Sequence, residues 1–475
     1  MIESPIVVEF DKGSPSSWLG SIQLRTGEVF LDSGKDNHAE YATVDVLALY
    51  PQEQLLFEPH EVIGLEKKTI KALEEFSQQP WVDSDGKVIS LRAWSQLSKK
   101  LDLPLPFCMC ALSYELGAQA KGIRPRAVNH IAPALWAARY DALYIWDRQN
   151  QKGWLVGVST ASIERLELRI NHAQFKEDED LCSPLTELSS VKFEPQCQFS
   201  DYRAQFESLS EHLDKGNLYQ MNLTLPLSLQ LGSAVSSLIL YRHLREVNSG
   251  QFSFYVQIDA QRSLLSFSPE RLVKWDGYKL LPSIEQRFIE TAPIKGTRPR
   301  GSTHQEDKSL LQELLTSKKD AAEHVMILDL ERNDLSRLCK SASVRVIEDR
   351  RGRSYATVHH LVSVVRGELD IQHGLADILD SLFPGGSVTG APKYRSMQEI
   401  RSIEPFARGI YCGALGYLDP IGGGDLNLPI RTLVQNHQTL IYHAGGGIVA
   451  DSTVEGEWQE LWVKTKGMEK VFSPS

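Results

Sequence analysis

The end of the chain restricts the fold more than any other stretch, because a glycine run there leads into a predicted helix start. Residues 444–447 read Ala-Gly-Gly-Gly. Consecutive glycines at the end of a strand favour a place where a ligand or another stretch of backbone comes close. Ser452 and Glu455 then have the spacing of a capping box, which predicts that a helix begins at this point. We therefore expect a glycine-rich strand end followed directly by a helix.

This predicted helix carries two carboxylates and an amine on one side. Glu457, Glu460 and Lys464 fall at i, i+3 and i+7, within about 60° of one another around the helix axis. Two neighbouring carboxylates repel each other unless a positive group lies between them. A solvent-exposed helix face has the same spacing and accounts for most such triplets. Beside a glycine-rich strand end, a hard cation such as Mg²⁺ is the second interpretation.

A second notable stretch covers residues 293–300, which read Pro-Ile-Lys-Gly-Thr-Arg-Pro-Arg. Lys295 lies between the apolar Ile294 and the flexible Gly296. An amine in an apolar pocket loses solvation, so its pKa falls and it becomes a usable nucleophile. The alternative is an exposed basic loop, which these eight residues taken alone favour. The segments that follow in the chain reverse that order.

Composition narrows the class of protein. The chain has 475 residues, a length that suggests roughly two to four structural units. Its net charge of −10 argues against a general binder of nucleic acid or membrane surfaces. Six cysteines without paired metal spacing fit a reducing cytosol. Without a secretory signal at the start or an apolar run near about 18 residues, we expect a soluble, cytoplasmic protein.

The main boundary predicted from composition falls within residues 171–200. This stretch holds an acidic run at 176–180, several serines and two prolines, so it reads as a linker or long surface excursion. After it, Ser200 has the position of a helix cap, with Gly216 past the end of the predicted helix. Residues 252–258 and 263–267 predict a hairpin.

Further candidate groups follow these elements. Glu270 comes directly after the hairpin and could act as a general acid, although a lone carboxylate is more often solvated or salt-bridged. Glu323 lies on a helix predicted over residues 320–339, where it reads as surface charge. Residues 383–393 form a glycine-rich turn into a helix with Pro392 near its first position. Such a turn presents backbone N–H groups to an anion.

Taken together, these segments resemble the chorismate-utilising family, which includes anthranilate synthase component I, aminodeoxychorismate synthase component I, and the isochorismate and salicylate synthases. The resemblance covers residues 195–470. It is carried by several motifs that match in order: Tyr219 to Thr224, Ser268 to Glu270, Pro293 to Thr297, Ala322 to His324, Phe383 to Gly386, Ile430 to Thr432 and Gly445 to Val449.

The residue at position 295 separates the members of this family. Anthranilate synthases resemble this chain but carry a small residue there, whereas aminodeoxychorismate synthases carry lysine. By resemblance, Lys295 attacks chorismate at C2 and the C4 hydroxyl leaves; ammonia then adds at C4 and displaces the lysine. Water-adding members place a lysine where this chain has Gln220. The resemblance therefore implies an ammonia-dependent route to p-aminobenzoate and folate.

The resemblance also implies roles for the other motif residues. Mg²⁺ would be the cofactor, held by Glu323, Glu457 and Glu460. Glu270 would protonate the leaving hydroxyl, with Thr297 and His360 completing the catalytic set; a buried core histidine is the alternative for His360. The implied substrate contacts are Gln220, Ser387, Tyr411, Arg431, Lys464 and the amides of Gly446 and Gly447.

The implied fold is α+β, with two large, mostly antiparallel sheets packed together and helices outside. Residues 1–185 would form the N-terminal region and residues 186–475 the chorismate-binding catalytic region, both sharing one core. No cysteine in a glycine-rich elbow marks a glutaminase in this chain. By resemblance, a separate glutamine amidotransferase subunit would supply ammonia. Two alternatives remain open: anthranilate synthase component I, and a non-catalytic chorismate-binding paralogue.

Overall fold

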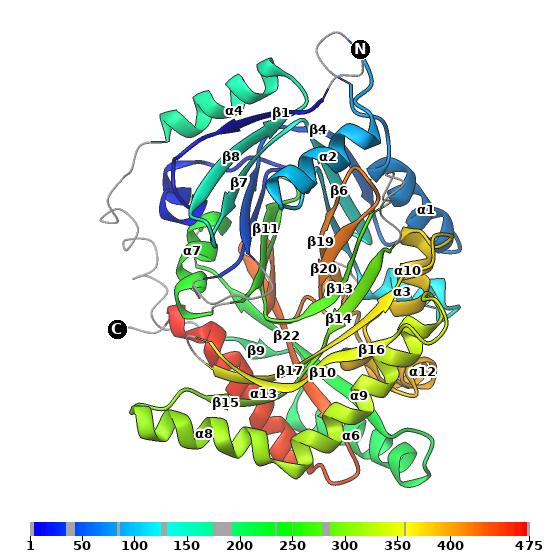
Figure 1. Ribbon diagram of the computed structural model, residues 1–475. Coiled ribbons are helices and arrows are strands. Elements are labelled where there is room, and N and C mark those ends of the chain that lie inside the picture. The colour runs from blue at the N-terminus through cyan, green and yellow to red at the C-terminus, as the bar shows by residue number, and fades with distance from the viewer. Residues whose placement is uncertain are drawn as a thin grey trace.

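The computed structural model describes residues 4–34, 43–82, 86–124, 131–173, 192–232, 235–248, 250–277, 286–355 and 358–472. Two large sheets dominate it, and every strand pair in both is antiparallel. Helices cover the outside of the sheets (Figure 1). The predicted α+β class, with two antiparallel sheets and external helices, is confirmed.

The first sheet runs from the N-terminal strand to the glycine-rich strand end near the C-terminus. In spatial order its strands are β1 (Ile6–Glu9), β8 (Lys152–Gly157), β7 (Ala142–Asp147), β3 (Val44–Ala48), β2 (Val29–Asp32), β11 (Phe252–Gln257), β12 (Arg262–Ser268), β21 (Thr432–Asn436), β22 (Thr439–Ile448), β10 (Gln220–Gln230) and β18 (Gly390–Ala391), with β9 (Glu194–Pro195) on β10. The predicted hairpin is confirmed as β11 and β12.

The second sheet holds the lysine stretch at one edge. Its strands are β15 (Ile294–Pro299), β17 (Val358–Glu368), β14 (Phe288–Ala292), β13 (Arg271–Trp275), β20 (Gly424–Asn427), β19 (Ala414–Leu418), β5 (Cys108–Leu112), β6 (Leu135–Tyr140) and β4 (Pro51–Phe57), with β16 (Arg345–Ser354) on β17. Both sheets combine strands from before residue 174 with strands from after residue 191. The predicted boundary between residues 185 and 186 lies outside the described residues.

Helices lie above and below the two sheets and on both sides of them in the view of Figure 1. The α-helices are α1 (Glu66–Ser77), α2 (Leu91–Leu101), α3 (Tyr114–Ala120), α4 (Thr160–His172), α6 (Phe199–Asp214), α7 (Ser237–Val247), α8 (His304–Thr316), α9 (Lys318–Ser336), α10 (Leu375–Leu382), α11 (Gly386–Thr389), α12 (Lys393–Ile403) and α13 (Val454–Glu469), and the 3₁₀ turns are η1 (Pro15–Ser17), η2 (Leu19–Ser21) and η4 (Lys470–Phe472). Within the described ranges, no helix is long and apolar enough to cross a membrane.

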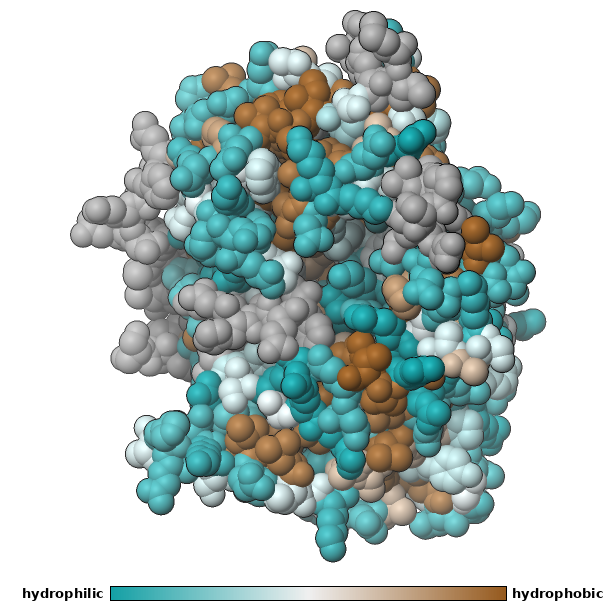
Figure 2. Space-filling view, in the orientation of Figure 1, coloured by the Kyte–Doolittle hydropathy of each residue, from teal (hydrophilic) through white to brown (hydrophobic). Residues whose placement is uncertain are grey.

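Charge and hydropathy are distributed as in an ordinary globular protein. The face in Figure 2 is mostly hydrophilic, and its hydrophobic side chains form separate areas rather than one continuous surface. Inside, the buried side chains include Trp18, Trp94 and Trp136, each at most 1% exposed. The helices that concern function are α9, which packs on β15 and β17, and α13, which packs on β22.

The structure corrects several local predictions. Residues 293–300 are not a loop: Ile294–Pro299 form strand β15, because their backbone pairs with β17. The last helix is capped by Thr453, whose hydroxyl accepts from the Gly456 N–H at 3.3 Å, rather than by Ser452. Helix α6 begins at Phe199 after Gln198, two residues earlier than a Ser200 cap requires. Pro392 precedes α12 as its cap instead of occupying the first turn.

Candidate functional site

Lys295 lies on β15 at the edge of the second sheet, where its ammonium donates to the Ser387 carbonyl at 3.3 Å. The pairing of β15 with β17 shifts register between Ile294 and Thr297, and Gly296 between them has φ +86°. Such an irregularity re-aims the side chains of an edge strand. Burial lowers the pKa of Lys295, and the nearby Glu270 carboxylate opposes that shift.

Glu270 lies between β12 and β13 and is 5% exposed. Its carboxylate accepts from the Ser387 hydroxyl at 2.8 Å and from the Ile294 N–H at 3.4 Å. Burial raises the pKa of Glu270 to about 7, although the Ser387 hydrogen bond and the Lys295 charge oppose the shift. A carboxyl that titrates near neutral pH can both hold and release a proton under ordinary conditions.

Thr297 and His360 form a pair across β15 and β17, where they are register partners. The Thr297 hydroxyl lies 3.0 Å from His360 Nδ1. His360 is 2% exposed, and burial lowers its pKa to about 3, so the ring is neutral at pH 7. Among the described residues, His360 Nε2 has no hydrogen-bond partner. The ring is therefore buried like a core histidine, yet one nitrogen remains available to a ligand.

Two carboxylates on the flanking helices lie near the Lys295 amine. Glu323 on α9 and Glu460 on α13 both act electrostatically on Lys295. Burial raises the pKa of Glu323 and of Glu457. A Cβ built on Gly446 would lie 3.0 Å from Glu457 Oε2 and 3.7 Å from Glu460 Oε1. The glycine thus lets the strand end approach the acidic face of α13 closely.

Lys464 occupies the acidic face in this arrangement. Its ammonium forms an ion pair with Glu460 at 2.8 Å and donates to the Gly445 carbonyl at 2.7 Å. The Lys464 charge lowers the pKa of Glu460. Across the described ranges, no three Asp, Glu, His or Cys side chains lie close enough together to share one metal ion. The donors are nonetheless all carboxylate oxygens, the ligand type that Mg²⁺ prefers.

Arg431 is a half-buried arginine without a side-chain partner among the described residues. Its backbone has φ +52°, a conformation rare for a residue with a side chain and frequent at functional sites. Its guanidinium makes no hydrogen bond or ion pair within the residues that the structure describes. Burial lowers the pKa of Arg431. After burial itself, the positive charge of Arg431 is the next cause that lowers the pKa of His360. An unpartnered guanidinium is a ready site for a carboxylate.

Gln220 and Tyr411 both lie beside β22, the strand that carries the glycine run. Gln220 is fully buried, and neither polar atom of its amide has a partner among the described residues. A Cβ on Gly447 would lie 2.2 Å from Gln220 Nε2, so the glycine lets the Gln220 amide pack directly against the strand end. Tyr411 stacks on His443 with ring centroids 5.3 Å apart. It lies beside Tyr442, which in turn lies beside Arg431.

The predicted residues therefore form one connected set, from Lys295, Glu270 and Ser387 at its centre to Arg431 and Tyr411 at its side. Three further residues were missed. Ser452 donates to Glu457 Oε1 at 2.7 Å, Lys319 acts on the acidic face, and Tyr442 lies between Tyr411 and Arg431. Only Lys319 had a usable signal, since it lies four residues before Glu323 on the same helix.

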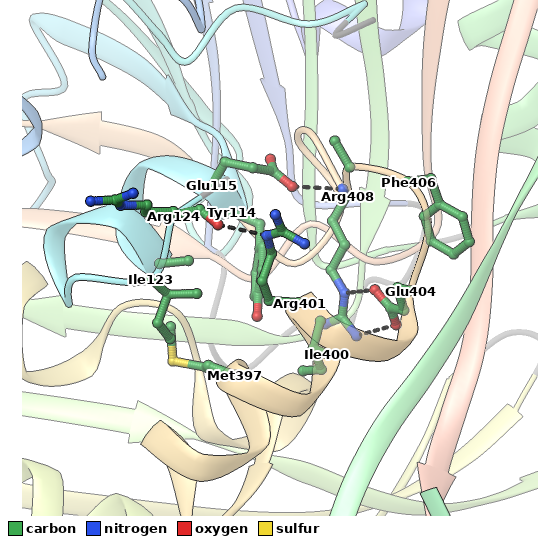
Figure 3. A pocket seen from close by; sticks show the side chains of 12 residues that line it. Tyr114, Glu115, Ile123, Arg124, Met397, Ile400, Arg401, Glu404, Phe406 and Arg408 are labelled. Carbon is green, nitrogen blue, oxygen red and sulfur yellow. Dashed lines mark hydrogen bonds and ion pairs between the residues drawn. The ribbon is translucent and has the colours of Figure 1, made fainter. Parts of the chain in front are cut away.

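A second buried charge cluster lies around a small pocket (Figure 3). Arg408 is 2% exposed, and its guanidinium binds both oxygens of Glu404 at 2.9 and 2.7 Å. It also donates to the main-chain carbonyls of Val388 at 2.9 Å and Asn222 at 2.8 Å. The Arg408 guanidinium lies over the ring of Tyr114, 4.8 Å from its centroid. Every nitrogen of this side chain has a protein partner.

Comparisons with known proteins agree with this geometry. Residues 28–470 match the model of the chorismate binding enzyme family. Aminodeoxychorismate synthase component 1 of Bacillus subtilis is 28% identical over 475 residues, with 95% of this chain and 93% of that protein covered. The Escherichia coli protein of the same name is 35% identical over 364 residues, covering 76% of each chain.

The fold is also that of a solved relative. The crystal structure of anthranilate synthase component I from Streptococcus pneumoniae superposes with a TM-score of 0.70 at 26% identity, covering 90% of this chain and 93% of that chain. Relatives with two different reactions thus resemble the chain over nearly its whole length. The family match and these relatives together mean that the chain belongs to the chorismate-binding enzyme family.

Proposed function

We propose that this protein is an aminodeoxychorismate synthase component I, which converts chorismate and ammonia to 4-amino-4-deoxychorismate on the route to p-aminobenzoate and folate. One observation carries the proposal: a lysine amine, Lys295, lies beside the buried Glu270 and on the Ser387 carbonyl. Two relatives that carry the name aminodeoxychorismate synthase support it.

The proposed reaction uses Lys295 as a nucleophile. The neutral amine forms a bond to C2 of chorismate while the ring double bond shifts and the C4–O bond breaks. Glu270, with a pKa of about 7, gives its proton to the departing hydroxyl, which leaves as water. Ammonia then forms a bond to C4, the C2–N bond breaks, and the lysine amine is released. The proton lost from the added ammonia is available to return Glu270 to its acid form.

The remaining residues would hold the substrate. Arg431, without a partner in the described part of the chain, would bind a chorismate carboxylate as a bidentate donor. Lys464 and the amides of Gly446 and Gly447 would bind the enolpyruvyl side, with Tyr411 beside them. In the same proposal Gln220 and Ser387 face the ring, and Thr297 orients His360, whose neutral Nε2 is available to a substrate oxygen.

Mg²⁺ fits the acidic side of this site. Glu323, Glu457 and Glu460 offer only hard oxygen donors, and burial raises the pKa of the first two, as expected for carboxylates without a matching cation. When bound, the ion would balance these charges and attract the carboxylate of chorismate. Lys464 would then exchange its Glu460 contact for the substrate.

Ammonia would come from a separate glutamine amidotransferase subunit. The relatives named above are each called component 1, and this chain contains no glutaminase nucleophile motif. The active complex would thus be a heterodimer, and its place would be the cytoplasm. High ammonium would replace the partner in a purified system.

The test uses the purified chain with chorismate, Mg²⁺ and ammonium. We expect the parent to form 4-amino-4-deoxychorismate, identified by mass and by p-aminobenzoate formation after addition of a pyruvate-releasing lyase. Lys295→Ala should lower kcat about 10³-fold or more, because the covalent route is lost. Lys308→Ala, an exposed lysine on α8, is the matched control and should behave as the parent.

Mass spectrometry of the parent trapped during turnover should detect a lysine adduct at residue 295. If Lys295→Ala keeps most of the parent's rate for the 4-amino product, the covalent mechanism is wrong. Fluorescent anthranilate from the parent would instead identify an anthranilate synthase. Binding of chorismate and Mg²⁺ with no product of either kind would identify a non-catalytic paralogue.

A further inference from the structure

Residues 383–392 connect α10 to α12, and one side chain joins the two ends of this connection. Lys393 follows it directly, at the first position of α12. The Lys393 ammonium donates to the carbonyls of Ser381 and Leu382, the last two residues of α10, at 3.5 and 3.3 Å. Carbonyls at a helix C-terminus lack partners within the helix, and a cation there is favoured by the helix dipole. The ammonium therefore closes residues 383–392 into a ring.

Helix α9 anchors the same ammonium. Lys393 forms an ion pair with Asp334, and the Ser381 hydroxyl donates to the Asp334 carbonyl at 2.7 Å. Lys393 is 9% and Asp334 4% exposed. Because a buried charge without its partner is strongly unfavourable, these two residues hold each other in place. Three helices, α9, α10 and α12, thus meet at one nitrogen.

The middle of the ring is supported from behind. Glu331 lies one helical turn before Asp334 on α9 and is 5% exposed. A Cβ on Gly386 would lie 3.2 Å from Glu331 Oε1 and 2.6 Å from the Leu330 side chain. Gly386 therefore rests directly on α9, with no room for a side chain between them. The turn is packed on one side and clamped at both ends.

The clamped turn presents Ser387 to the candidate site. The Ser387 hydroxyl donates to Glu270 at 2.8 Å, and its carbonyl accepts from Lys295 at 3.3 Å. A single residue thus contacts both groups that react in the proposed mechanism. A shift of this turn would change both contacts together. Displacements of about 1 Å at a reacting centre can lower rates about 100-fold.

We propose that Lys393 is a positioning residue: by joining the ends of residues 383–392 it sets the place of Ser387, and through Ser387 that of Lys295 and Glu270. The inference rests on the proposed function, in which these two residues react. Lys393 itself touches neither of them. Its ammonium is held by Asp334 and the α10 carbonyls, and its charge also lowers the pKa of the Glu331 carboxyl behind the turn, a group that in turn feels the Glu270 charge.

A double-mutant cycle tests this. Lys393→Met removes the ammonium but keeps the apolar stem, and Ser387→Ala removes the hydroxyl that stabilises the Glu270 carboxylate. Each should lower kcat for chorismate consumption about 10- to 100-fold. Each should also move the basic limb of the kcat/KM profile to higher pH, because loss of that hydrogen bond raises the pKa of Glu270.

The double variant decides between a positioning role and a purely structural one. If Lys393 acts through Ser387, adding Lys393→Met to Ser387→Ala moves the basic limb no further. A further shift of the basic limb of the kcat/KM profile in the double variant would overturn the proposal. So would a Lys393→Met variant whose melting temperature falls while its basic limb stays at the parent's pH. Lys121→Met is the control, since Lys121 also donates to an α10 carbonyl, that of Asp380, but lies outside the ring. The basic limb of the kcat/KM profile of Lys121→Met should match the parent's.

Asp334→Asn provides a second, milder variant if Lys393→Met does not fold. It keeps the ammonium and weakens its anchor, so the limb should move in the same direction by a smaller amount; an unmoved limb counts against the proposal. Chorismate consumption and product mass are recorded separately. A parent that makes a different amino product contradicts the proposed function, while the cycle on chorismate consumption still reports on Lys393.

Discussion

Two arginines, the buried Arg408 and the half-buried Arg431, show how differently this fold treats the same side chain. The Arg408 guanidinium has a partner for every nitrogen, and the neighbouring Glu404 raises its pKa above the already high ordinary value (Figure 3). The Arg431 guanidinium has none within the described residues, and burial lowers its pKa. One guanidinium is stabilised by the fold alone, whereas the other requires something that the chain does not supply.

The difference distinguishes a structural site from a binding site. A buried charge is tolerated when its partners are built into the protein, as around Arg408. Where the partners are missing, the protein bears an unfavourable free energy that a ligand can relieve. Glu404 likewise has the buried Arg408 as its ion-pair partner, whereas burial raises the pKa of the half-buried Glu457 and Glu323.

The largest expected effect is a loss of folding stability when the buried pair of Arg408 and Glu404 is broken. Arg408→Met leaves Glu404 buried without its cation and should lower the free energy of unfolding by about 3–5 kcal/mol, measured by urea denaturation. Arg332→Met, which breaks the exposed pair with Asp329, is the control and should lose less than about 1 kcal/mol. A loss at Arg408 as small as the control's would contradict the structural assignment.

Arg431→Gln should behave in the opposite way. We expect kcat/KM for chorismate to fall by about 2–4 kcal/mol of transition-state stabilisation, because a carboxylate loses its bidentate partner. The melting temperature should stay equal to or above the parent's, since an unpartnered charge is removed. Steady-state kinetics and thermal unfolding measure both. A drop in melting temperature with unchanged kcat/KM would make Arg431 a structural residue like Arg408.

The carboxylates on α13 come next. Glu457→Gln and Glu460→Gln keep the helix but each remove a charged oxygen, so the Mg²⁺ concentration for half-maximal rate should rise at least about 10-fold, with turnover nearly abolished at low Mg²⁺. Calorimetric titration with Mg²⁺ should show the same weakening, with little change in fold stability. Unchanged rates and titrations in both variants would restore the exposed-helix interpretation.

The smallest effect is the pH dependence of Glu270. Because burial raises its pKa from 4.5 to about 7, kcat/KM should fall about tenfold per unit as pH rises above 7, since the acid form is lost. The folded state keeps a proton that the unfolded state releases. This group's contribution to stability is therefore full below pH 4.5, is lost as pH rises to about 7, and is constant above that. Glu270→Gln should remove the change in stability with pH; a parent profile flat from pH 6 to 9 would contradict the assignment.

The sequence predicts an element correctly where the periodicity of that element's own residues decides its structure. The hairpin β11–β12 and the helix α13 follow from alternation, spacing and turn residues. The helix start was misplaced by one residue because Ser452 and Thr453 are both good caps, and only the fold shows that Ser452 is used by Glu457.

Resemblance to a family contributed what periodicity could not. The resemblance selected Glu270, Lys295 and Ser387, which lie far apart in the sequence. The fold brings these three residues into contact. Neither the resemblance nor composition indicated that residues 294–299 are a strand. Pairing with β17 decides that, and such pairing depends on residues far away in the sequence, as in the pair of Ile294 with Val362.

The sequence by itself determined the family, the spacing of the α13 carboxylates and the presence of a lysine at position 295, because these depend on residue identity and on order along the chain. Only the tertiary structure decided that every nitrogen of the Arg408 guanidinium has a partner while the Arg431 guanidinium has none among the described residues. It also decided that Lys393 joins the two ends of residues 383–392, which carry Ser387. The physical reason is that burial and partnership are set by which distant segments pack together. Two arginines of one chain can therefore end in opposite electrostatic states.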